Sequence, residues 1–367
     1  MGLLIAELVL RVFDLRPERY PYPKWLALGS GTFKERGMWG GGLIKQPCRI
    51  GGQEIAMGEY VPGATMKVVY GGRGGEFDDK TGVVMRINSL GFRGPETTVE
   101  KKAGTYRVLG LGDSFTFGVG AEDEQTFLRR LEASLNAKWP SKEMEFEVLN
   151  VGVQGYNTRD EVLCLEHRWL KFAPDLVLIT FYLNDAYSDQ AFLNRGQGLG
   201  IYLTEPEGLG RYSRLFDFAQ HAYRSRLMRQ EMDEYYAKHY FTQPAEYFSS
   251  PTSRNVDWHD CREALERAKQ LTDEHNMKLA LVIFPELHQL DDYPFRSLHT
   301  IVSKACRSLD IEVLDLIDTF EGMNERDLWC HPSDHHPNAE AHRIASEAID
   351  PFLREQILMR SDPPGHD

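Results

Sequence analysis

The sequence predicts an α/β protein in which helices cover both faces of a central parallel sheet. Two observations predict this three-layer α/β/α arrangement. Short apolar stretches suited to strands alternate with amphipathic helical stretches between residues 106 and 353. Residues 175–181 are almost all apolar, which is typical of a strand covered on both faces. Alternation of this kind favours parallel strands joined by right-handed crossovers.

The individual elements follow from apolar runs and helical periodicity. Strands are expected at residues 107–111, 146–151, 175–181, 278–284 and 312–316. Helices are expected at residues 124–138, 158–171, 258–275, 297–309 and 339–353. Thr158 is expected to cap the second of these helices, with Glu161 three residues later. Together the elements predict a flavodoxin-like domain over residues 101–358.

Residues 1–100 have a different character, because glycine and proline are dense and only two runs, 65–70 and 82–88, suit strands. We expect a loop-rich segment, with a small antiparallel hairpin, that wraps the main domain. An insertion at residues 186–256 is rich in tyrosine, and residues 213–236 within it are helical in pattern. Its place after a central strand suits a lid or a wall of a substrate pocket. A helical decoration that packs on the body is the alternative.

The first residues of the chain allow two interpretations. Residues 3–13 are apolar apart from Glu7 and Arg11, which lie one helical turn apart. This stretch is shorter than the ~20 apolar residues that span a bilayer, and it lacks the basic start and cleavage site of a secretory signal. It is either an amphipathic helix docked on the body or a partner, or a peripheral membrane contact or the remnant of a longer anchor. The compartment and the oligomeric state stay open.

Composition excludes some classes of function. The formal net charge of −13 disfavours a nucleic-acid-binding protein, which needs a basic face against phosphate. Five cysteines are present, but they are widely spaced and form no Cys-x-x-Cys pair. The sequence therefore predicts ordinary thiols rather than a zinc site or a disulfide framework.

The candidate nucleophile is Ser114, in the run Gly112-Asp113-Ser114 directly after the first strand of the main domain. Open α/β sheets place reactive groups at the carboxyl ends of their strands. Glycine lets the backbone turn sharply there and lets a substrate approach closely. The alternative is that Ser114 caps a helix in a fold without catalytic activity, while Asp113 is expected to bond the backbone of the turn.

A serine nucleophile needs a base, and the base needs an acceptor that orients it. His336 lies on a predicted loop before the last helix, from which it can reach the carboxyl edge of the sheet. Asp334, two residues earlier, can accept a hydrogen bond from one ring nitrogen while the other faces Ser114. His331 and His335 raise the alternative of a metal site, but no carboxylate or cysteine set completes one. Acyl transfer at serine needs no metal or organic cofactor, and none is expected.

Donors for the tetrahedral oxyanion are expected after three different strands. They are the backbone N–H groups of Ser114 and Gly155 and the side chain of Asn184. The alternative for Asn184 is a turn residue that bonds local backbone, and Asp185 is expected to be structural.

Four separated blocks together resemble the SGNH/GDSL hydrolase superfamily: Gly-Asp-Ser, a glycine after a strand, Asn-Asp, and Asp-x-His-Pro-Asn. The resemblance covers about residues 105–353. It implies that Ser114, Gly155, Asn184 and His336 carry catalysis, with Asp334 as the acid of the triad. It also implies a hydrolase of esters.

Two departures from the family pattern concern the site itself. Tyr182 stands where the third block usually has glycine, which predicts a narrower pocket beside Asn184. Ser333 stands where the acid usually lies, three residues before the histidine. If Asp334 does not reach His336, the alternative is a dyad in which a backbone carbonyl orients the histidine.

The predicted function is hydrolysis of an O-acyl ester, such as an O-acetyl ester, of a small molecule or glycan through an acyl-enzyme. An O-acyltransferase that modifies a glycan or a metabolite, and a binding module without catalytic activity on the same fold, are the alternatives.

Overall fold

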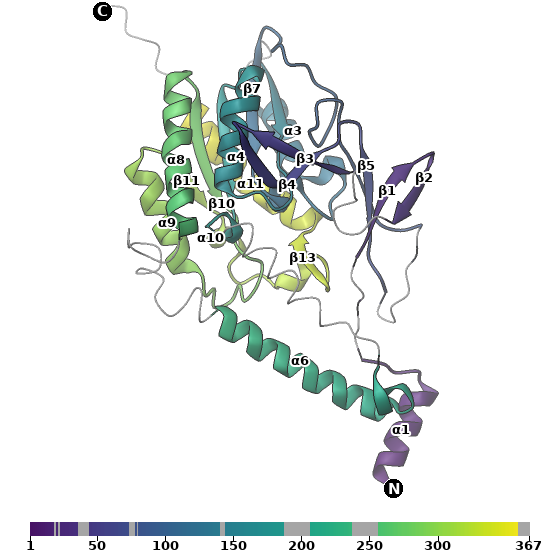
Figure 1. The fold of residues 1–367 in the computed structure, drawn as a ribbon. Helices are drawn as coiled ribbons and strands as arrows, with labels where there is room; N and C mark the ends of the chain where they lie inside the picture. The colour runs from purple at the N-terminus through teal and green to yellow at the C-terminus, as the bar shows by residue number, and fades with distance from the viewer. Residues whose placement is uncertain are drawn as a thin grey trace, which may run out of the picture.

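A computed structural model describes residues 1–17, 20, 23–35, 44–72, 78, 80–139, 144–186, 206–236 and 256–358 of the chain (Figure 1). Its centre is a five-stranded parallel sheet in the order β11-β10-β9-β7-β8. The strands are β7 (Thr105–Leu111), β8 (Glu145–Asn150), β9 (Leu176–Phe181), β10 (Lys278–Ile283) and β11 (Glu312–Asp315). Every residue of β9 is buried, as its apolar run predicts. The five predicted strands and the flavodoxin-like fold are confirmed.

The strand order reverses at β7, since β8 lies on one side of it and β9 on the other. In open α/β sheets a ligand binds outside the carboxyl ends of the strands at such a reversal. A ligand site is therefore expected among the residues that follow β7, β8 and β9. These residues include Ser114, Gly155 and Asn184.

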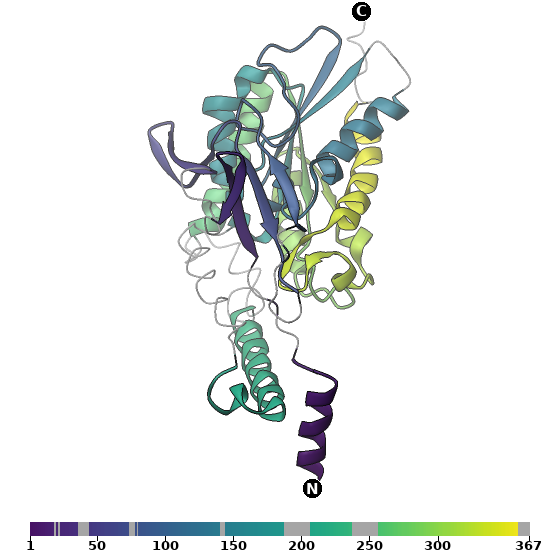
Figure 2. The same ribbon diagram turned by 90° about the vertical axis from the view of Figure 1, so that its right-hand side faces the viewer.

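Two pairs of helices complete the three layers. Helices α3 (Phe127–Lys138) and α11 (Ala339–Phe352) pack against each other on one side of the sheet, and α4 (Thr158–Cys164) and α8 (Val256–Glu274) pack on the other (Figure 2). Helix α9 (Arg296–Ser308) lies against the edge strand β11.

The start of the second helix differs from the prediction. The cap of α4 is Asn157, whose side chain accepts from the backbone N–H of Asp160. Thr158 and Glu161 are instead buried, so the expected capping box is not formed. Beyond Cys164 the helix continues as a π-helical turn, Leu165–Trp169, and a 3-10 turn, Leu170–Phe172.

The N-terminal segment contains more β-structure than the sequence indicates. The predicted hairpin is present as β5 (Thr65–Val69) and β6 (Val83–Arg86), which pair antiparallel. It belongs to a four-stranded sheet with β1 (Lys24–Gly29) and β2 (Thr32–Glu35), in the order β2-β1-β5-β6. A second hairpin joins β3 (Lys45–Ile50) to β4 (Gln53–Tyr60). These four strands were not predicted, because lysine, glutamate and glycine interrupt their apolar pattern.

Arg93 joins this segment to the main domain. Its side chain is buried, and its guanidinium donates to the carbonyls of Phe117 at 2.6 Å and Ala121 at 2.5 Å and pairs with Asp123 at 3.1 Å. Because a buried cation is stable only when its donors are satisfied, Arg93 fixes the N-terminal segment to the turns that follow Ser114.

The insertion is described only in part. Helix α6 (Arg214–Tyr236) confirms the predicted helical pattern, while residues 187–205 and 237–255, on which the lid interpretation mostly depends, lie outside the described residues. Helix α6 projects from the body beyond the edge that carries β13 (Asp334–Pro337), and its far end contacts the N-terminal helix α1 (Gly2–Val12) (Figures 1 and 2). Among the described residues, no helix is long and apolar enough to cross a membrane.

Candidate active site

Ser114 is the first residue of the short helix α2 (Ser114–Phe117), three residues after β7 ends. Between them Gly112 has φ +154°, and a Cβ at this position would lie 2.0 Å from the Thr116 hydroxyl oxygen. Only glycine therefore allows the chain to turn from the strand into the helix here. Asp113 caps the helix, with Oδ1 accepting from the backbone N–H of Phe115 at 2.8 Å.

Asp113 also joins two of the predicted site residues. Its Oδ2 accepts from the Asn184 side-chain amide at 2.9 Å and from the Ser114 hydroxyl at 3.3 Å. Asn184 lies in the 3-10 turn Leu183–Ala186, directly after β9. A shared carboxylate therefore holds Ser114 and Asn184 side by side. The expectation that Asp113 bonds the local backbone is correct but incomplete.

His336 and Asp334 lie on a hairpin where the sequence indicated a loop. The strands β12 (Trp329–His331) and β13 pair antiparallel before α11. Successive side chains of a strand alternate between its two faces, so residues two apart point the same way. Asp334 Oδ1 consequently reaches His336 Nδ1 at 2.5 Å. Ser333, at the usual position of the acid, contacts His331 instead, at 2.8 Å.

The Asp334–His336 pair determines the charge of both groups. Burial alone would raise the pKa of Asp334, but the nearby imidazole and several hydrogen bonds lower it to about 2. Burial likewise disfavours the charged imidazole, yet the attraction of Asp334 outweighs burial and raises the pKa of His336 above its ordinary value. Asp334 thus stabilises the protonated form of His336 and already occupies its Nδ1. This leaves Nε2 for the nucleophile.

Helix α2 lies against β13, with the Phe115 and His336 rings 5.6 Å apart between centroids. Within the described part of the chain, the Ser114 hydroxyl has its one hydrogen bond with Asp113, and it is not bonded to His336. Catalytic hydrogen bonds are often long or unformed without substrate.

Gly155 lies in the loop that follows β8, with φ +81°. The same loop touches α2, since a Cβ on Gly152 would lie 2.6 Å from the backbone nitrogen of Phe117. The loop is held from the other side by Lys45 of β3, whose ammonium donates to the Gln154 carbonyl at 2.7 Å. The loop that carries Gly155 is thus fixed beside the helix that begins with Ser114.

Buried carboxyl groups lie behind Asp113. Glu161 and Asp185 are at most 1% exposed, and Asp185 accepts from the backbone N–H of Tyr182 at 2.6 Å. Burial, together with repulsion between these acids, raises the pKa of both Glu161 and Asp185 well above the ordinary range. Burial also raises the pKa of Asp113. Asp185 therefore closes the turn that carries Asn184.

The stacked rings of Tyr182 and Phe115 form an aromatic wall beside the site. The rings of Tyr182 and Phe115 stack at 4.0 Å between centroids, and the Tyr182 hydroxyl donates to Glu286. Because Tyr182 is held both by its ring and by its hydroxyl, it is a fixed surface near Asn184 rather than a movable side chain.

The three histidines between residues 331 and 336 have separate partners. His331 stacks on Tyr70, His335 stacks on Trp329 at 3.8 Å, and His336 pairs with Asp334.

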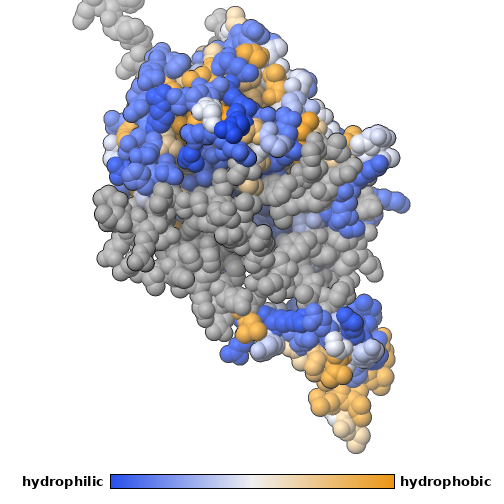
Figure 3. All heavy atoms as spheres, in the orientation of Figure 1, coloured by the Kyte–Doolittle hydropathy of each residue, from blue (hydrophilic) through white to orange (hydrophobic). Residues whose placement is uncertain are grey.

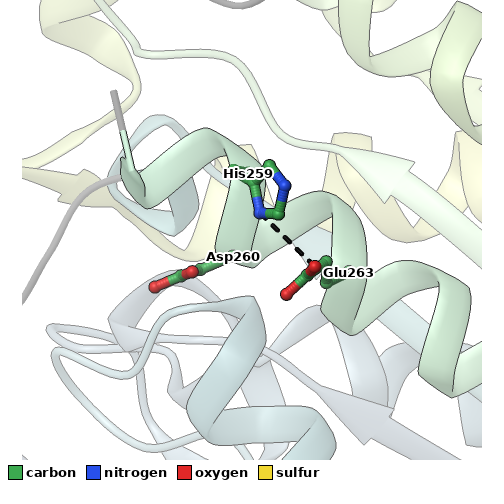
Figure 4. Close-up of side chains that lie close together, drawn as sticks. All are labelled: His259, Asp260 and Glu263. Atoms are coloured by element: carbon green, nitrogen blue, oxygen red, sulfur yellow. Dashed lines mark ion pairs between the residues drawn. The ribbon is translucent and has the colours of Figure 1, made fainter. Parts of the chain in front are cut away.

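Another group has the composition of a metal site. Among the described residues, one set of His, Asp and Glu side chains has its potential ligand atoms within 4.8 Å of one another: His259, Asp260 and Glu263 on α8 (Figure 4). His259 and Glu263 are exposed, and the imidazole lies 3.5 Å from the carboxylate, as is ordinary for an i,i+4 pair on a helix surface.

Sequence reasoning missed three residues around the predicted site: Tyr70 contacts Asp334, Lys45 holds the loop of Gly155, and Glu286 bonds Tyr182. Tyr70 donates to Asp334 at 2.9 Å. These residues come from the N-terminal segment or from the loop after β10, and no local motif marks them. The one signal available was the apolar run at 65–70, which ends at Tyr70.

The chain matches the GDSL-like Lipase/Acylhydrolase family over residues 111–344. This match covers more than half of its 367 residues. The chain belongs to this family, which confirms the resemblance seen in the sequence, and it is an enzyme of the carboxylic ester hydrolase class. None of the curated proteins matches the chain.

Several solved structures are similar to this one. A two-domain esterase (CEX) active on acetylated mannans shares 14% identity, with a TM-score of 0.42, over 72% of this chain and 53% of that chain. The chain therefore spans about half the length of that esterase. The acetyl xylan esterase AlAXEase shares 16% identity, with a TM-score of 0.39, over 66% of this chain and 97% of that chain. A variant of Axe2, an acetyl xylan esterase from Geobacillus stearothermophilus, shares 15% identity, with a TM-score of 0.40, over 68% of this chain and 94% of that chain.

Proposed function

We propose that this enzyme hydrolyses short-chain O-acyl esters, with acetyl as the preferred acyl group, through a covalent intermediate on Ser114. The observation that carries the proposal is the Asp334–His336 pair, joined at 2.5 Å on a strand that lies against the helix beginning with Ser114. This pair supplies an oriented base beside a hydroxyl at the carboxyl edge of the sheet.

In the first half of the reaction, Ser114 Oγ attacks the carbonyl carbon of the ester while His336 Nε2 takes the hydroxyl proton. The carbonyl oxygen becomes an oxyanion, to which the backbone N–H groups of Ser114 and Gly155 donate. Asn184 adds a third donor, because its amide has two N–H bonds and Asp113 uses one of them. His336 then protonates the leaving alcohol as the C–O bond breaks.

In the second half, water attacks the acyl group and gives a proton to His336. The tetrahedral intermediate collapses, the acid leaves, and the proton returns to Ser114. Asp334 stays ionised throughout and stabilises the imidazolium, which agrees with its lowered pKa of about 2, a shift caused by His336 and by hydrogen bonds acting against burial. No step requires a metal or organic cofactor.

The short acyl group is inferred from the aromatic wall. Tyr182 replaces the small residue usual at its position, and its stacking on Phe115 and bond to Glu286 keep it in place beside Asn184. A fixed ring there limits the space for carbons beyond the acyl carbonyl. The alcohol part of the ester is not defined by this wall, and a glycan or a small metabolite both fit the proposal.

Replacing the nucleophile tests the reaction directly. We expect Ser114→Ala to lower kcat/KM for 4-nitrophenyl acetate by at least ~1000-fold, because loss of the attacking oxygen removes the covalent route. Ser308→Ala, at an exposed position on α9, is the matched control and should behave as the wild type. Unchanged hydrolysis by Ser114→Ala would exclude this mechanism. Transfer of acetyl to an added acceptor alcohol in preference to water would identify the enzyme as an O-acyltransferase.

Acyl-chain length tests the aromatic wall. The wild type should hydrolyse 4-nitrophenyl acetate better than the butyrate and octanoate esters. In Tyr182→Gly the ratio of kcat/KM for octanoate to that for acetate should rise ~10-fold or more, since each methylene that gains a pocket contributes to binding. Tyr182→Phe keeps the ring and should keep the preference. Equal chain-length profiles in all three proteins would show that Tyr182 does not limit the acyl group.

A further inference from the structure

The N-terminal helix α1 has only two charged side chains, and both are used in its contact with α6. Glu7 accepts from the Ser213 hydroxyl at 2.9 Å and from the backbone N–H groups of Arg214 at 3.0 Å and Leu215 at 2.8 Å. These are donors at the start of α6, which lack partners within that helix. Arg11 pairs with Glu7 at 2.6 Å and donates to the Tyr212 carbonyl. Helix α1 is thus held by its polar strip.

The rest of α1 is apolar and, apart from the half-buried Ala6 and Leu10, exposed. Leu4 is 77% exposed, Leu8 61%, Val12 67% and the following Phe13 69%, and α1 has no buried residue. These positions, together with Leu3, leave only the Glu7–Arg11 strip polar. Figure 3 shows the resulting apolar tip at the end of the molecule farthest from the central sheet. Exposed apolar surface of this extent marks a contact site.

The start of α6 adds the features of a membrane interface. Tyr212 and Tyr223 are exposed, and aromatic side chains of this type gather at the level of lipid headgroups. Residues 1–17 and 206–227 contain six arginines and four acidic residues, in a chain whose formal net charge is −13. This end of the molecule is therefore locally basic, which suits anionic headgroups.

We propose that α1 and the start of α6 form a lipid-binding surface that inserts α1 into the interface of a bilayer. The apolar side chains lie around most of the circumference of α1. A protein partner would cover only one face of the helix, whereas lipid can surround every face that is apolar. The surface lies beyond the body edge that carries β13, so binding would hold the catalytic edge toward the membrane (Figures 1 and 2).

Vesicle binding by the full chain tests this surface. The protein should cosediment with phosphatidylcholine vesicles containing about a third phosphatidylglycerol. The double variant Leu4→Glu with Leu8→Glu should lose at least ~10-fold in partition coefficient. Leu28→Glu replaces an exposed leucine of β1 on the body and is the control that should bind as the wild type.

Three results would overturn the lipid proposal: no cosedimentation of the wild type, equal binding by the double variant, or loss of binding in the control. A wild-type dimer that the double variant separates, measured by light scattering without vesicles, would also overturn it and would identify a second copy of the chain as the occupant. Esterase activity in solution should be the same in all three proteins, which shows that the variants fold.

A second inference rests on the proposed function and concerns Tyr70. This residue follows β5 and lies outside residues 111–344, which match the family. Its hydroxyl donates to Asp334 Oδ2 at 2.9 Å while Oδ1 of the same carboxylate holds His336. The Tyr70 ring stacks on His331 at 4.9 Å, and its hydroxyl lies 3.1 Å from Cys330 Sγ. The side chain is therefore fixed on both its face and its end.

We infer that Tyr70 is a positioning residue that orients the Asp334 carboxylate toward His336. A carboxylate held at both oxygens cannot rotate away from the imidazole. The N-terminal segment thereby supports the site at two points, since Lys45 also holds the loop that carries Gly155. The hydrogen bond from the Tyr70 hydroxyl to Asp334 Oδ2 also draws negative charge toward that oxygen. Less negative charge then remains on Oδ1, which faces His336.

The titration of His336 depends on all the groups around it. Besides Asp334 on its own strand, these are Asp113 at the end of β7, Glu286 after β10, His335 and His342 of α11. Removal of the Tyr70 hydroxyl leaves Asp113, Glu286, His335 and His342 in place and removes one hydrogen bond from Asp334 Oδ2, so the carboxylate presents more of its negative charge to His336. It should therefore raise the pKa of His336, because the imidazolium faces a less neutralised carboxylate.

The test compares Tyr70→Phe with the wild type over the pH range of activity. We expect kcat to fall about 3- to 10-fold with unchanged KM, and the acidic limb of the kcat/KM profile to move to higher pH. Tyr106→Phe is the matched control, because the buried Tyr106 hydroxyl has no hydrogen-bond partner among the described residues. An unchanged pH profile and kcat in Tyr70→Phe would refute the positioning role. If Ser114→Ala were inactive at the same time, the proposed mechanism would still stand.

Discussion

The active site depends on one buried carboxylate, that of Asp113. It caps the helix that begins with Ser114, and it accepts from the side chain of Asn184 at 2.9 Å. These two bonds connect the ends of β7 and β9, which are neighbours in the sheet. The proposed nucleophile and a proposed oxyanion donor, which follow different strands, are thereby held by a common partner. Since a buried acceptor that loses its donors is costly, each of these residues also stabilises the position of the others.

The proposed base, His336, comes from a separate part of the chain and is held in a different way. Asp334 and His336 share one face of β13, and this short strand lies against the helix of the nucleophile. The carboxylate of the pair contacts the N-terminal segment through Tyr70. The catalytic domain is therefore not self-contained at this point. Residues that precede the region matched by the family complete the environment of the base.

Much of this arrangement could be predicted from the sequence. The central strands are apolar on both faces, so continuous apolar runs in the sequence predict where they lie. The carboxyl ends of parallel strands must also meet at one edge of the sheet. That edge brings Ser114, Gly155 and Asn184 together without any knowledge of tertiary contacts. The N-terminal strands could not be read in this way, because β3 alternates irregularly between buried and exposed positions.

The spacing of Asp334 and His336 shows what sequence patterns leave undetermined. The two residues are only two positions apart, and the unpredicted β-conformation lets them pair by placing both side chains on one face of the strand. The role of Tyr70 could not be predicted at all, since it lies 264 residues from its partner. Contacts at that separation are set by how the two parts of the chain pack.

The central claim is that Ser114 is an activated nucleophile, and covalent labelling with a fluorophosphonate tests it most directly. The folded protein should gain one adduct, and peptide mass spectrometry should place it on Ser114. Replacement of His336 by alanine should slow labelling strongly, because the hydroxyl loses its base. Absence of an adduct in the folded protein, or an adduct at another serine, would contradict the account and favour a binding module on the same fold.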